Sequence, residues 1–159
     1  SARGTMPALV KAFELIGTGQ VAKSAMEAQR DMLIINEADS ITFNKERVLY
    51  DAKQRALAMV EGYEPPEEAT FRLPGATGRA TIDMALHDFH LKGMATDHDV
   101  TVGRAVGQVL TGENTDVTEE LTERDLLKLE QKYFVKLLKE PKSLARMEHM
   151  LNTNKPLRN

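Results

Sequence analysis

The sequence predicts an all-α protein, an irregular multi-helix bundle of about six to seven helices with little or no sheet. Apolar residues recur at spacings of three, four and seven along several segments, as they do on one face of an α-helix. Glycine and proline mark the ends of these segments. The composition is 42% hydrophobic but only 5% aromatic, with eight methionines and no tryptophan. It therefore indicates an aliphatic core of packed helices and disfavours a β-sandwich.

The strongest helical signal lies at 122–138, and we expect the other helices to pack around it. Its apolar residues form one broad stripe: Leu126, Leu127, Leu129, Tyr133, Phe134, Leu137 and Leu138. Lysine and glutamate fill the opposite side. Thr122 and Asp125 have the spacing of a capping box, which marks the start of this helix. The pattern predicts that the stripe organises the core.

The first 63 residues begin with two predicted helices. One covers 5–16 and is followed by two glycines. Ser24 and Glu27 form a capping box for a second, short helix. Short extended pieces are predicted at 32–35 and 41–43. Because a core-facing helix begins so close to the start of the chain, we expect the chain to be a piece of a longer polypeptide.

A third helix is predicted over 45–61, where Asn44 can cap its start. Its apolar residues share one face: Val48, Leu49, Ala52, Ala56, Leu57, Met59 and Val60. This spacing predicts a helix whose apolar face is buried.

Two prolines at 63–68 disfavour helix and favour an extended linker. We place a domain boundary there, between an N-terminal helical part at 1–63 and a C-terminal helical part at 64–159. The second part contains three further predicted helices: 79–91, from Thr96 or Asp97 to Thr111, and a last one opened by Pro141. The spacing predicts their inward faces: Ala80, Met84, Ala85 and Phe89; Val102, Ala105, Val106, Val109 and Leu110; Leu144, Met147, Met150 and Leu151.

Composition excludes several classes of function. The net charge of −3 gives no global attraction to nucleic acid, so we expect no nucleic-acid partner. The absence of cysteine excludes disulfides, thiolate metal sites and cysteine nucleophiles. No apolar run approaches the length of a membrane span. We therefore expect a cytoplasmic protein.

Two histidines, His87 and His90, stand three residues apart and could share a helix face to bind a metal ion. A third ligand would have to come from Asp97, His98 or Asp99. Because no carboxylate or thiolate stands at ligand spacing, solvated histidines are the favoured interpretation. We assign no metal site here.

Other segments give weak signals for chemistry. The loop at 74–78 precedes a helix and could present N–H groups to an anion, but it lacks the P-loop lysine and the full dinucleotide glycine pattern. An ordinary turn is favoured. Ser24, Ser40 and Ser143 lie in no nucleophile-elbow pattern and have no histidine paired to them by motif, so a hydrolase is not predicted.

A row of basic residues follows the last third of the chain: Lys128, Lys132, Lys136, Lys139, Lys142 and Arg146. Three of them, Lys132, Lys136 and Lys139, share a helix face. A solvated surface is the favoured interpretation because charged helix faces are usually hydrated. A patch for a polyanionic ligand such as a CoA nucleotide is the alternative, and the sequence leaves both open.

Three stretches together resemble a known family. They are KAFELIGTGQVAKSAMEAQ at 11–29, NKERVLYDAKQRALAMVEGYEPP at 44–66 and LLKLEQKYFVKLLKEPKSLARMEHMLNTNKPLRN at 126–159. They resemble the C-terminal region of bacterial 3-hydroxyacyl-CoA dehydrogenases of fatty-acid β-oxidation. In that type, an N-terminal NAD-binding dehydrogenase is fused to a C-terminal enoyl-CoA hydratase-like (crotonase) region. The likeness covers nearly the whole chain, and its terminal pattern is the most specific part.

The resemblance implies a helical portion that covers the catalytic part and helps to assemble subunits. The dinucleotide fingerprint, the dehydrogenase His–Glu pair and the hydratase carboxylates would all lie before Ser1. We therefore assign no catalytic and no cofactor-binding residue, and NAD is implied only for the parent enzyme. The expected partners are the rest of the parent enzyme, further copies in a homo-oligomer, and acyl-CoA bound through the parent. The chain alone is expected to be inactive.

Two other functions compete with this interpretation. One is a free-standing helical module that binds an acyl-CoA or a partner helix through the basic row or methionine-rich grooves. The other is a metal-dependent enzyme built on His87 and His90.

Overall fold

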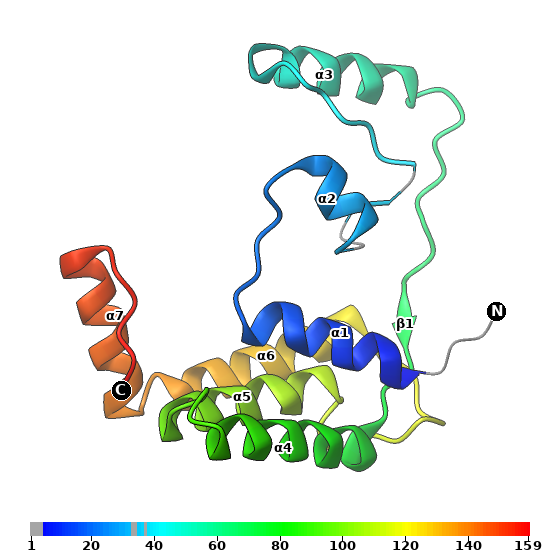
Figure 1. Ribbon diagram of the computed structural model, residues 1–159. Helices are drawn as coiled ribbons and strands as arrows, with labels where there is room; N and C mark the ends of the chain where they lie inside the picture. The colour runs from blue at the N-terminus through cyan, green and yellow to red at the C-terminus, as the bar shows by residue number, and fades with distance from the viewer. Residues whose placement is uncertain (1–4, 33–34, 37) are drawn as a thin grey trace. The chain divides into compact units, whose positions relative to one another are not determined.

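The structure is a computed structural model that describes residues 5–32, 35, 36 and 38–159. Within these residues it contains seven α-helices, one short 3-10 helix and a two-stranded antiparallel sheet (Figure 1). This confirms the predicted mostly-α, multi-helix fold with little sheet. None of the described helices is long and apolar enough to cross a membrane.

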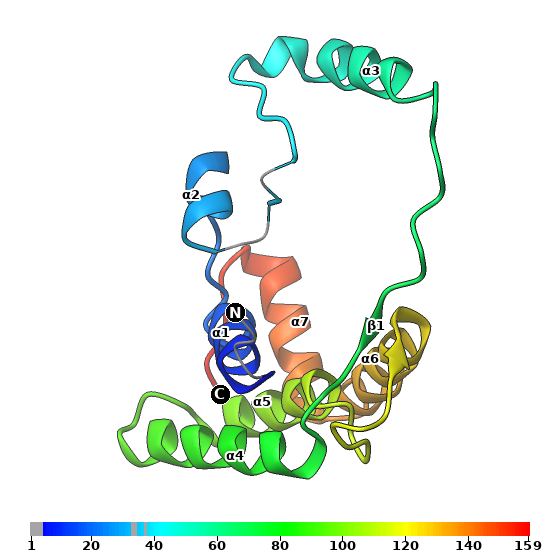
Figure 2. The same ribbon diagram turned by 90° about the vertical axis from the view of Figure 1, so that its right-hand side faces the viewer.

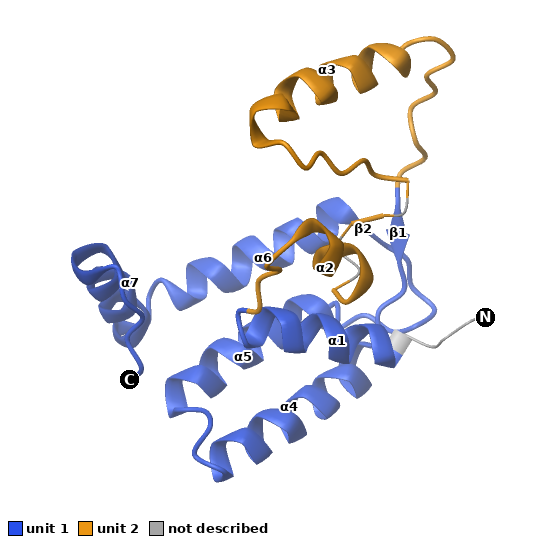
Figure 3. Ribbon diagram, turned by 45° about the horizontal axis from the view of Figure 1, so that its top comes forward, with its two compact units in different colours: residues 1–19, 69–159 blue, residues 20–68 orange. Residues whose placement is uncertain are grey.

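The chain divides into two compact units, which Figure 3 distinguishes by colour. Unit 1 comprises residues 1–19 and 69–159, and unit 2 comprises residues 20–68. The contacts thus group the first helix with the C-terminal helices. The domain boundary proposed at residue 64 stays a prediction.

Unit 1 contains five helices and the small sheet. Its elements are α1 (Thr5–Gly17), β1 (Thr70–Phe71), α4 (Gly75–Leu91), α5 (Asp97–Leu110), β2 (Leu121–Thr122), α6 (Glu123–Leu137) and α7 (Pro141–Thr153). α4 packs against α5, α5 packs against α6, and α1 contacts both α4 and α5. β1 pairs with β2, which fixes the start of α6 beside the start of α4. Figure 2 shows α7 turning away from the end of α6.

The core of unit 1 lies where α1, α4 and α5 meet. Its buried residues are Leu9, Phe13, Ile82 and Leu86. Two glycines of α5 let α4 approach closely. A Cβ added at Gly103 would lie 2.5 Å from Leu86 Cδ2, and one added at Gly107 would lie 3.1 Å from Ile82 Cγ2. The absence of side chains at these two positions therefore makes room for the core of α4.

The prediction that the stripe at 122–138 organises the core is wrong. α6 does begin after Thr122, and both halves of the predicted capping box with Asp125 are present. However, none of the residues 123–137, all of which the structure describes, is buried. Leu127 and Phe134 are more than half exposed. The stripe spans a wider arc of the helix than its neighbour α5 covers, so much of it faces solvent.

Two other predicted inward faces are corrected. In α4 the buried residues are Gly75, Gly78, Ile82 and Leu86, whereas the predicted Met84 is 74% exposed. α5 packs on the face that carries these residues, which lies about a third of a turn away from the predicted face. The predicted face of α7 is exposed: Leu144, Met147, Met150 and Leu151. The predicted inward face of α5 agrees better with the structure, because Ala105 is buried and the other residues predicted for that face are half-buried.

Unit 2 contains α2 (Ala25–Arg30), a 3-10 helix (Lys45–Arg47) and α3 (Val48–Ala58). Ser24 caps α2 as predicted, because its Oγ accepts from the Glu27 N–H at 3.1 Å, while Glu27 accepts from the Lys23 N–H. Part of the extended piece predicted at 32–35 lies outside the described residues. The structure describes 41–43 and shows no strand there.

The predicted burial of the α3 face is wrong. None of the described residues 48–58 is buried, and Leu49 is 83% exposed. The buried hydrophobic residues of unit 2 are Ala28 and Met32 among those that the structure describes. The described part of unit 2 therefore leaves the apolar face of α3 exposed, although the segment before it hydrogen-bonds to Asp51 and Arg55.

Candidate functional site

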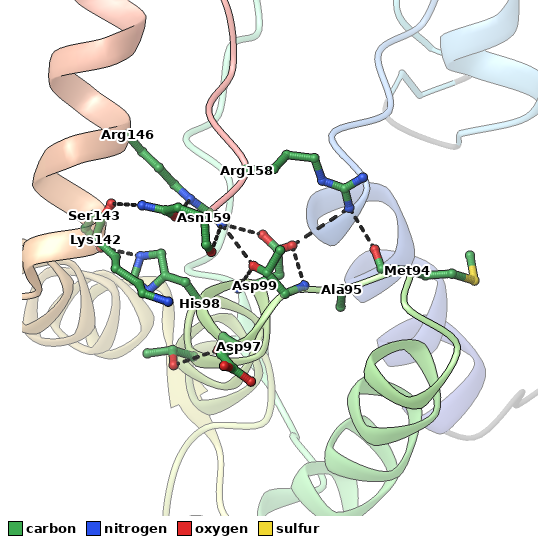
Figure 4. A network of polar contacts seen from close by, with 12 residues as sticks. Met94, Ala95, Asp97, His98, Asp99, Lys142, Ser143, Arg146, Arg158 and Asn159 are labelled. Atoms are coloured by element: carbon green, nitrogen blue, oxygen red, sulfur yellow. Dashed lines mark hydrogen bonds and ion pairs between the residues drawn. The ribbon is translucent and has the colours of Figure 1, made fainter.

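The densest polar network surrounds the first turn of α5 (Figure 4). Thr96 caps the helix: its Oγ1 accepts from the Asp99 N–H at 3.1 Å, and Asp99 Oδ2 accepts from the Thr96 N–H at 2.9 Å. Arg146 of α7 reaches this cap, and its Nη2 lies 2.8 Å from Asp99 Oδ1. The cap predicted from the sequence thus also anchors a helix that begins more than forty residues later.

The chain after α7 folds back onto the same cap. Arg146 donates through Nε to Asn159 Oδ1 at 2.8 Å. Arg158 donates to the carbonyl oxygen of Met94 at 2.7 Å and lies 3.8 Å from Asp99 Oδ2. Asn159 in turn donates to the carbonyl oxygen of Lys142 at 3.2 Å. Asp99 is therefore the shared acceptor that holds the two arginines in place.

The environment of Asp99 favours its charged form. Burial alone would raise the pKa of Asp99, but the hydrogen bond from the Thr96 backbone and the interaction with Arg146 together lower it overall. The carboxylate is consequently ionised over the whole neutral range and acts as a fixed negative charge.

We expect Arg146→Met to lower the free energy of unfolding by about 1–3 kcal/mol, because it leaves the half-buried Asp99 without its main cation. The side chains of Arg146 and Asp99 are only 24% and 27% exposed. Arg72→Met is the matched control, since it breaks an ion pair with Glu120 that is well exposed, and such pairs contribute about 0–1 kcal/mol. Urea unfolding of both variants measures the difference, and an equal effect would contradict a special role for Arg146.

A second contact joins α5 to α7. His98 is buried, and its Nε2 lies 3.0 Å from Ser143 Oγ. Burial lowers the pKa of His98, and the positive charges of Arg146 and Lys142 lower it further. His98 is therefore neutral at pH 7 and holds Ser143 by a hydrogen bond. No sequence motif relates this pair, because the two residues are 45 positions apart.

The lowered pKa of His98 predicts a pH-dependent stability. The unfolded chain takes up a proton near pH 6.5, whereas the folded chain resists it. The contribution of neutral His98 is therefore complete above about pH 6.5 and decreases as the pH falls below that value. Urea unfolding at about pH 7.5 and 5.5 should show a loss of stability that is smaller in His98→Gln. His87→Gln, at an exposed position of α4, should keep the wild-type loss; identical behaviour of the two variants would contradict the prediction.

An apolar groove of about 650 Å³ adjoins this network. Side chains of α1, α4 and α5, including Phe13, Leu86 and Val102, line it together with the chain after α7. Its size is in the range of small-molecule sites. The charged groups at its edge include Arg146 and Arg158, which already pair with Asp99. The groove therefore presents an apolar packing surface beside a network in which one aspartate pairs with two arginines.

The histidine cluster does not assemble as a metal site. His87, His90 and Asp97 line one pocket of about 250 Å³, but Arg104 lines it as well and places a cation there. His90 Nδ1 contacts the Ala95 carbonyl oxygen at 3.1 Å. Among the described residues, no three histidine or carboxylate side chains converge to hold a metal ion. His98 points away toward α7, as described above.

The segment 74–78 is not the predicted loop, because Gly75–Gly78 form the first turn of α4 after Pro74, so this helix begins four residues before the predicted start. The Gly75 N–H donates to the Thr111 carbonyl oxygen at 2.9 Å. A Cβ at Gly78 would lie 2.5 Å from Pro74 Cγ and 2.9 Å from Leu9 Cδ2. The glycines thus serve the close approach of α1 and the start of α4. The interpretation of 74–78 as an ordinary turn is therefore wrong.

Only some residues of the basic row form ion pairs. Lys128 pairs with Asp125, Lys132 with Glu113 and Arg146 with Asp99. In the part of the chain that the structure describes, no ion pair is formed by Lys136, Lys139 or Lys142. The row is therefore divided between structural ion pairs and three solvent-facing lysines.

Comparison with known proteins gives one informative match. The chain is 39% identical over 155 residues to a probable 3-hydroxyacyl-CoA dehydrogenase of Bacillus subtilis (strain 168). The alignment covers 97% of this chain but only 20% of that protein, so the chain spans about a fifth of its relative. No family model and no solved structure matches the chain. The match supports the dehydrogenase resemblance and leaves its hydratase-like part a prediction.

Proposed function

We propose that this chain is the C-terminal, enoyl-CoA hydratase-like part of a longer 3-hydroxyacyl-CoA dehydrogenase of fatty-acid β-oxidation. Its role is to pack against the catalytic part and to help assemble subunits, and it is not catalytic by itself. The similarity of nearly the whole chain to a fifth of a probable dehydrogenase supports this parentage.

The observation that carries the packing role is the exposed apolar face of α3. Val48, Leu49 and Leu57 are each about half exposed or more. Burying a leucine side chain fully contributes about 1.5–3 kcal/mol, so a partner that covers this face gains a substantial favourable term. Unit 2 buries only Ala28 and Met32 among its described hydrophobic residues, which is too small a core for an independent domain of its size.

The exposed apolar residues of α6 and α7 support the same role. Leu127 and Phe134 stand seven residues apart and share a face of α6, while Leu144 and Leu151 do so on α7. Exposed apolar surface at helical spacing is typical of faces that pack against another polypeptide. These two helices belong to unit 1, so both units present such surfaces.

Association with the missing polypeptide tests the packing role. The chain should bind, in a co-expression pull-down, the other four fifths of the longer relative. Leu49→Asp should abolish this binding, because it places a charge on the α3 face. Gln54→Asp, on the opposite side of α3, should leave it intact. Absence of binding, or equal binding by both variants, would contradict the proposal.

An activity assay tests the proposal that the chain is not catalytic by itself. The isolated chain should neither produce NADH from 3-hydroxybutyryl-CoA and NAD nor hydrate crotonyl-CoA. The longer enzyme, assayed in parallel, is the positive control. Turnover by the isolated chain in either assay would show that it carries its own catalytic groups.

A further inference from the structure

One buried donor in unit 1 has no acceptor. Arg79 Nη1, in α4, is buried and has no hydrogen-bond partner among the described residues. A buried polar group without a partner costs about 1–3 kcal/mol, and more when it is charged. Native structures rarely leave such a group unsatisfied, so an acceptor from outside the chain is expected at this position.

Arg79 lines a small cavity that has two lining residues in common with a larger cleft. The cavity has a volume of about 50 Å³ and is also lined by Arg104 and Gln108. Both residues also line a cleft of about 290 Å³ between α5 and α6, together with Tyr133 and Lys136. Since one water needs about 10–15 Å³ of such volume, the small cavity has room for a group of several oxygen atoms.

The charges around the cavity and the cleft leave an excess of donors. The charged residues are Arg79, Arg104, Lys132 and Lys136 on the positive side and Asp83, Glu113 and Glu140 on the negative side. Arg104 pairs with Asp83 at 2.9 Å, and Glu113 pairs with Lys132. Arg79, Lys136 and Glu140 remain without an ion pair in the part of the chain that the structure describes, which leaves an excess of one positive charge.

A hydrogen bond joins Tyr133, which lines the larger cleft, to Glu113. The Tyr133 hydroxyl donates to Glu113 Oε1 at 2.6 Å. Burial, together with Glu113, raises the pKa of Tyr133 to about 12. The hydroxyl therefore stays protonated and keeps its hydrogen bond to Glu113 Oε1. Lys132 and Tyr133 both donate to Glu113 Oε1, and Arg79 Nη1 donates to neither oxygen of Glu113.

We propose that the cleft between α4, α5 and α6 binds a ligand with an oxyanion group, either a phosphate or a carboxylate. One oxygen of the anion accepts from Arg79 Nη1 in the small cavity, and the rest of the ligand extends into the larger cleft toward Lys136. Arginine suits this role because its planar guanidinium matches both anions. The site lies wholly in unit 1 and does not depend on the proposed parentage.

Thermal unfolding of the whole chain tests this site. Sodium phosphate and sodium acetate are titrated at an ionic strength held constant with sodium chloride. The melting temperature should rise saturably with at least one of the two anions, and the anion that acts identifies the ligand class. Arg79→Met should weaken the apparent affinity at least about tenfold, while Arg124→Met, at an exposed position of α6, should not change it.

A direct spectroscopic readout makes the test independent of how well the variant folds. In the wild-type chain, the guanidinium N–H signals of Arg79 should shift with the active anion in parallel with the melting temperature. The proposal is overturned if neither anion stabilises the chain more than chloride does. It is also overturned if Arg79→Met responds like the wild type, or if the Arg79 signals stay unchanged during the titration.

Discussion

Gly75→Ala is expected to lower the free energy of unfolding by about 3–5 kcal/mol. Gly75 opens α4 with a φ of +50°, a conformation that costs an L-residue about 1–2 kcal/mol. An added Cβ would also lie 1.8 Å from the Thr115 carbonyl oxygen and 2.9 Å from its carbon. Those atoms belong to the backbone, so the clash displaces the loop before β2 and not merely a side chain.

Gly93→Ala separates the clash from the backbone strain. Gly93 also has a positive φ, +68°, but no described atom lies within 4 Å of a Cβ built there. We therefore expect a loss of only about 1–2 kcal/mol, from the strain alone. Urea unfolding followed by circular dichroism compares the two variants. Equal losses would show that the Thr115 backbone yields easily and that the packing at the start of α4 is loose.

Ile82→Ala is expected to lower the free energy of unfolding by about 2–5 kcal/mol, because it opens a cavity at the centre of unit 1. Ile82 is buried among Leu9, Phe13 and Leu86, and its Cγ2 faces Gly107 of α5. Gly107 has no side chain that could move in to fill the space. The cavity can therefore shrink only if α4 and α5 move closer to each other.

Met84→Ala is the matched control for the core. Met84 lies two residues further along α4, where the sequence analysis predicted an inward position, and it is well exposed. Its substitution should change the stability by no more than about 0.5 kcal/mol. If Met84→Ala destabilised the chain as much as Ile82→Ala, the predicted face of α4 would be the correct one and the observed core would be wrong.

The helix starts could be predicted because they depend on neighbouring residues. Thr96 with Asp99 and Thr122 with Asp125 form capping boxes whose two hydrogen bonds span three positions. Ser24 caps α2 through the first of these bonds, from the Glu27 N–H, while the Glu27 carboxylate accepts from the Lys23 N–H instead of the Ser24 N–H. Such local geometry is encoded directly in the order of the residues.

The buried faces could be predicted only in part, because periodicity defines an apolar arc and does not say which element covers it. α6 has the most regular stripe, yet the core forms around α4, where Gly103 and Gly107 allow a close approach. Glycine contributes nothing to a hydrophobic pattern. A search for apolar side chains therefore does not find the two glycines that let α4 pack closely against α5.

The polar contacts between helices could not be predicted from the sequence. Arg146 was assigned to a solvated basic row, but it forms the principal ion pair of Asp99. His98 was considered as a third metal ligand, but it is buried against Ser143. Each pair joins residues more than forty positions apart, and no motif relates them. The spacing of the Thr96 cap was the only local sign that this region is structurally important.

Amide hydrogen exchange along α3 tests the central claim most directly, namely that its apolar face is covered by further polypeptide. The amides of Val48–Ala58 are compared between the isolated chain and the proposed longer enzyme. Exchange of these amides should be at least about tenfold slower in the longer enzyme, with the amides of α4 and α5 little changed. Equal exchange of α3 in the two proteins would contradict it.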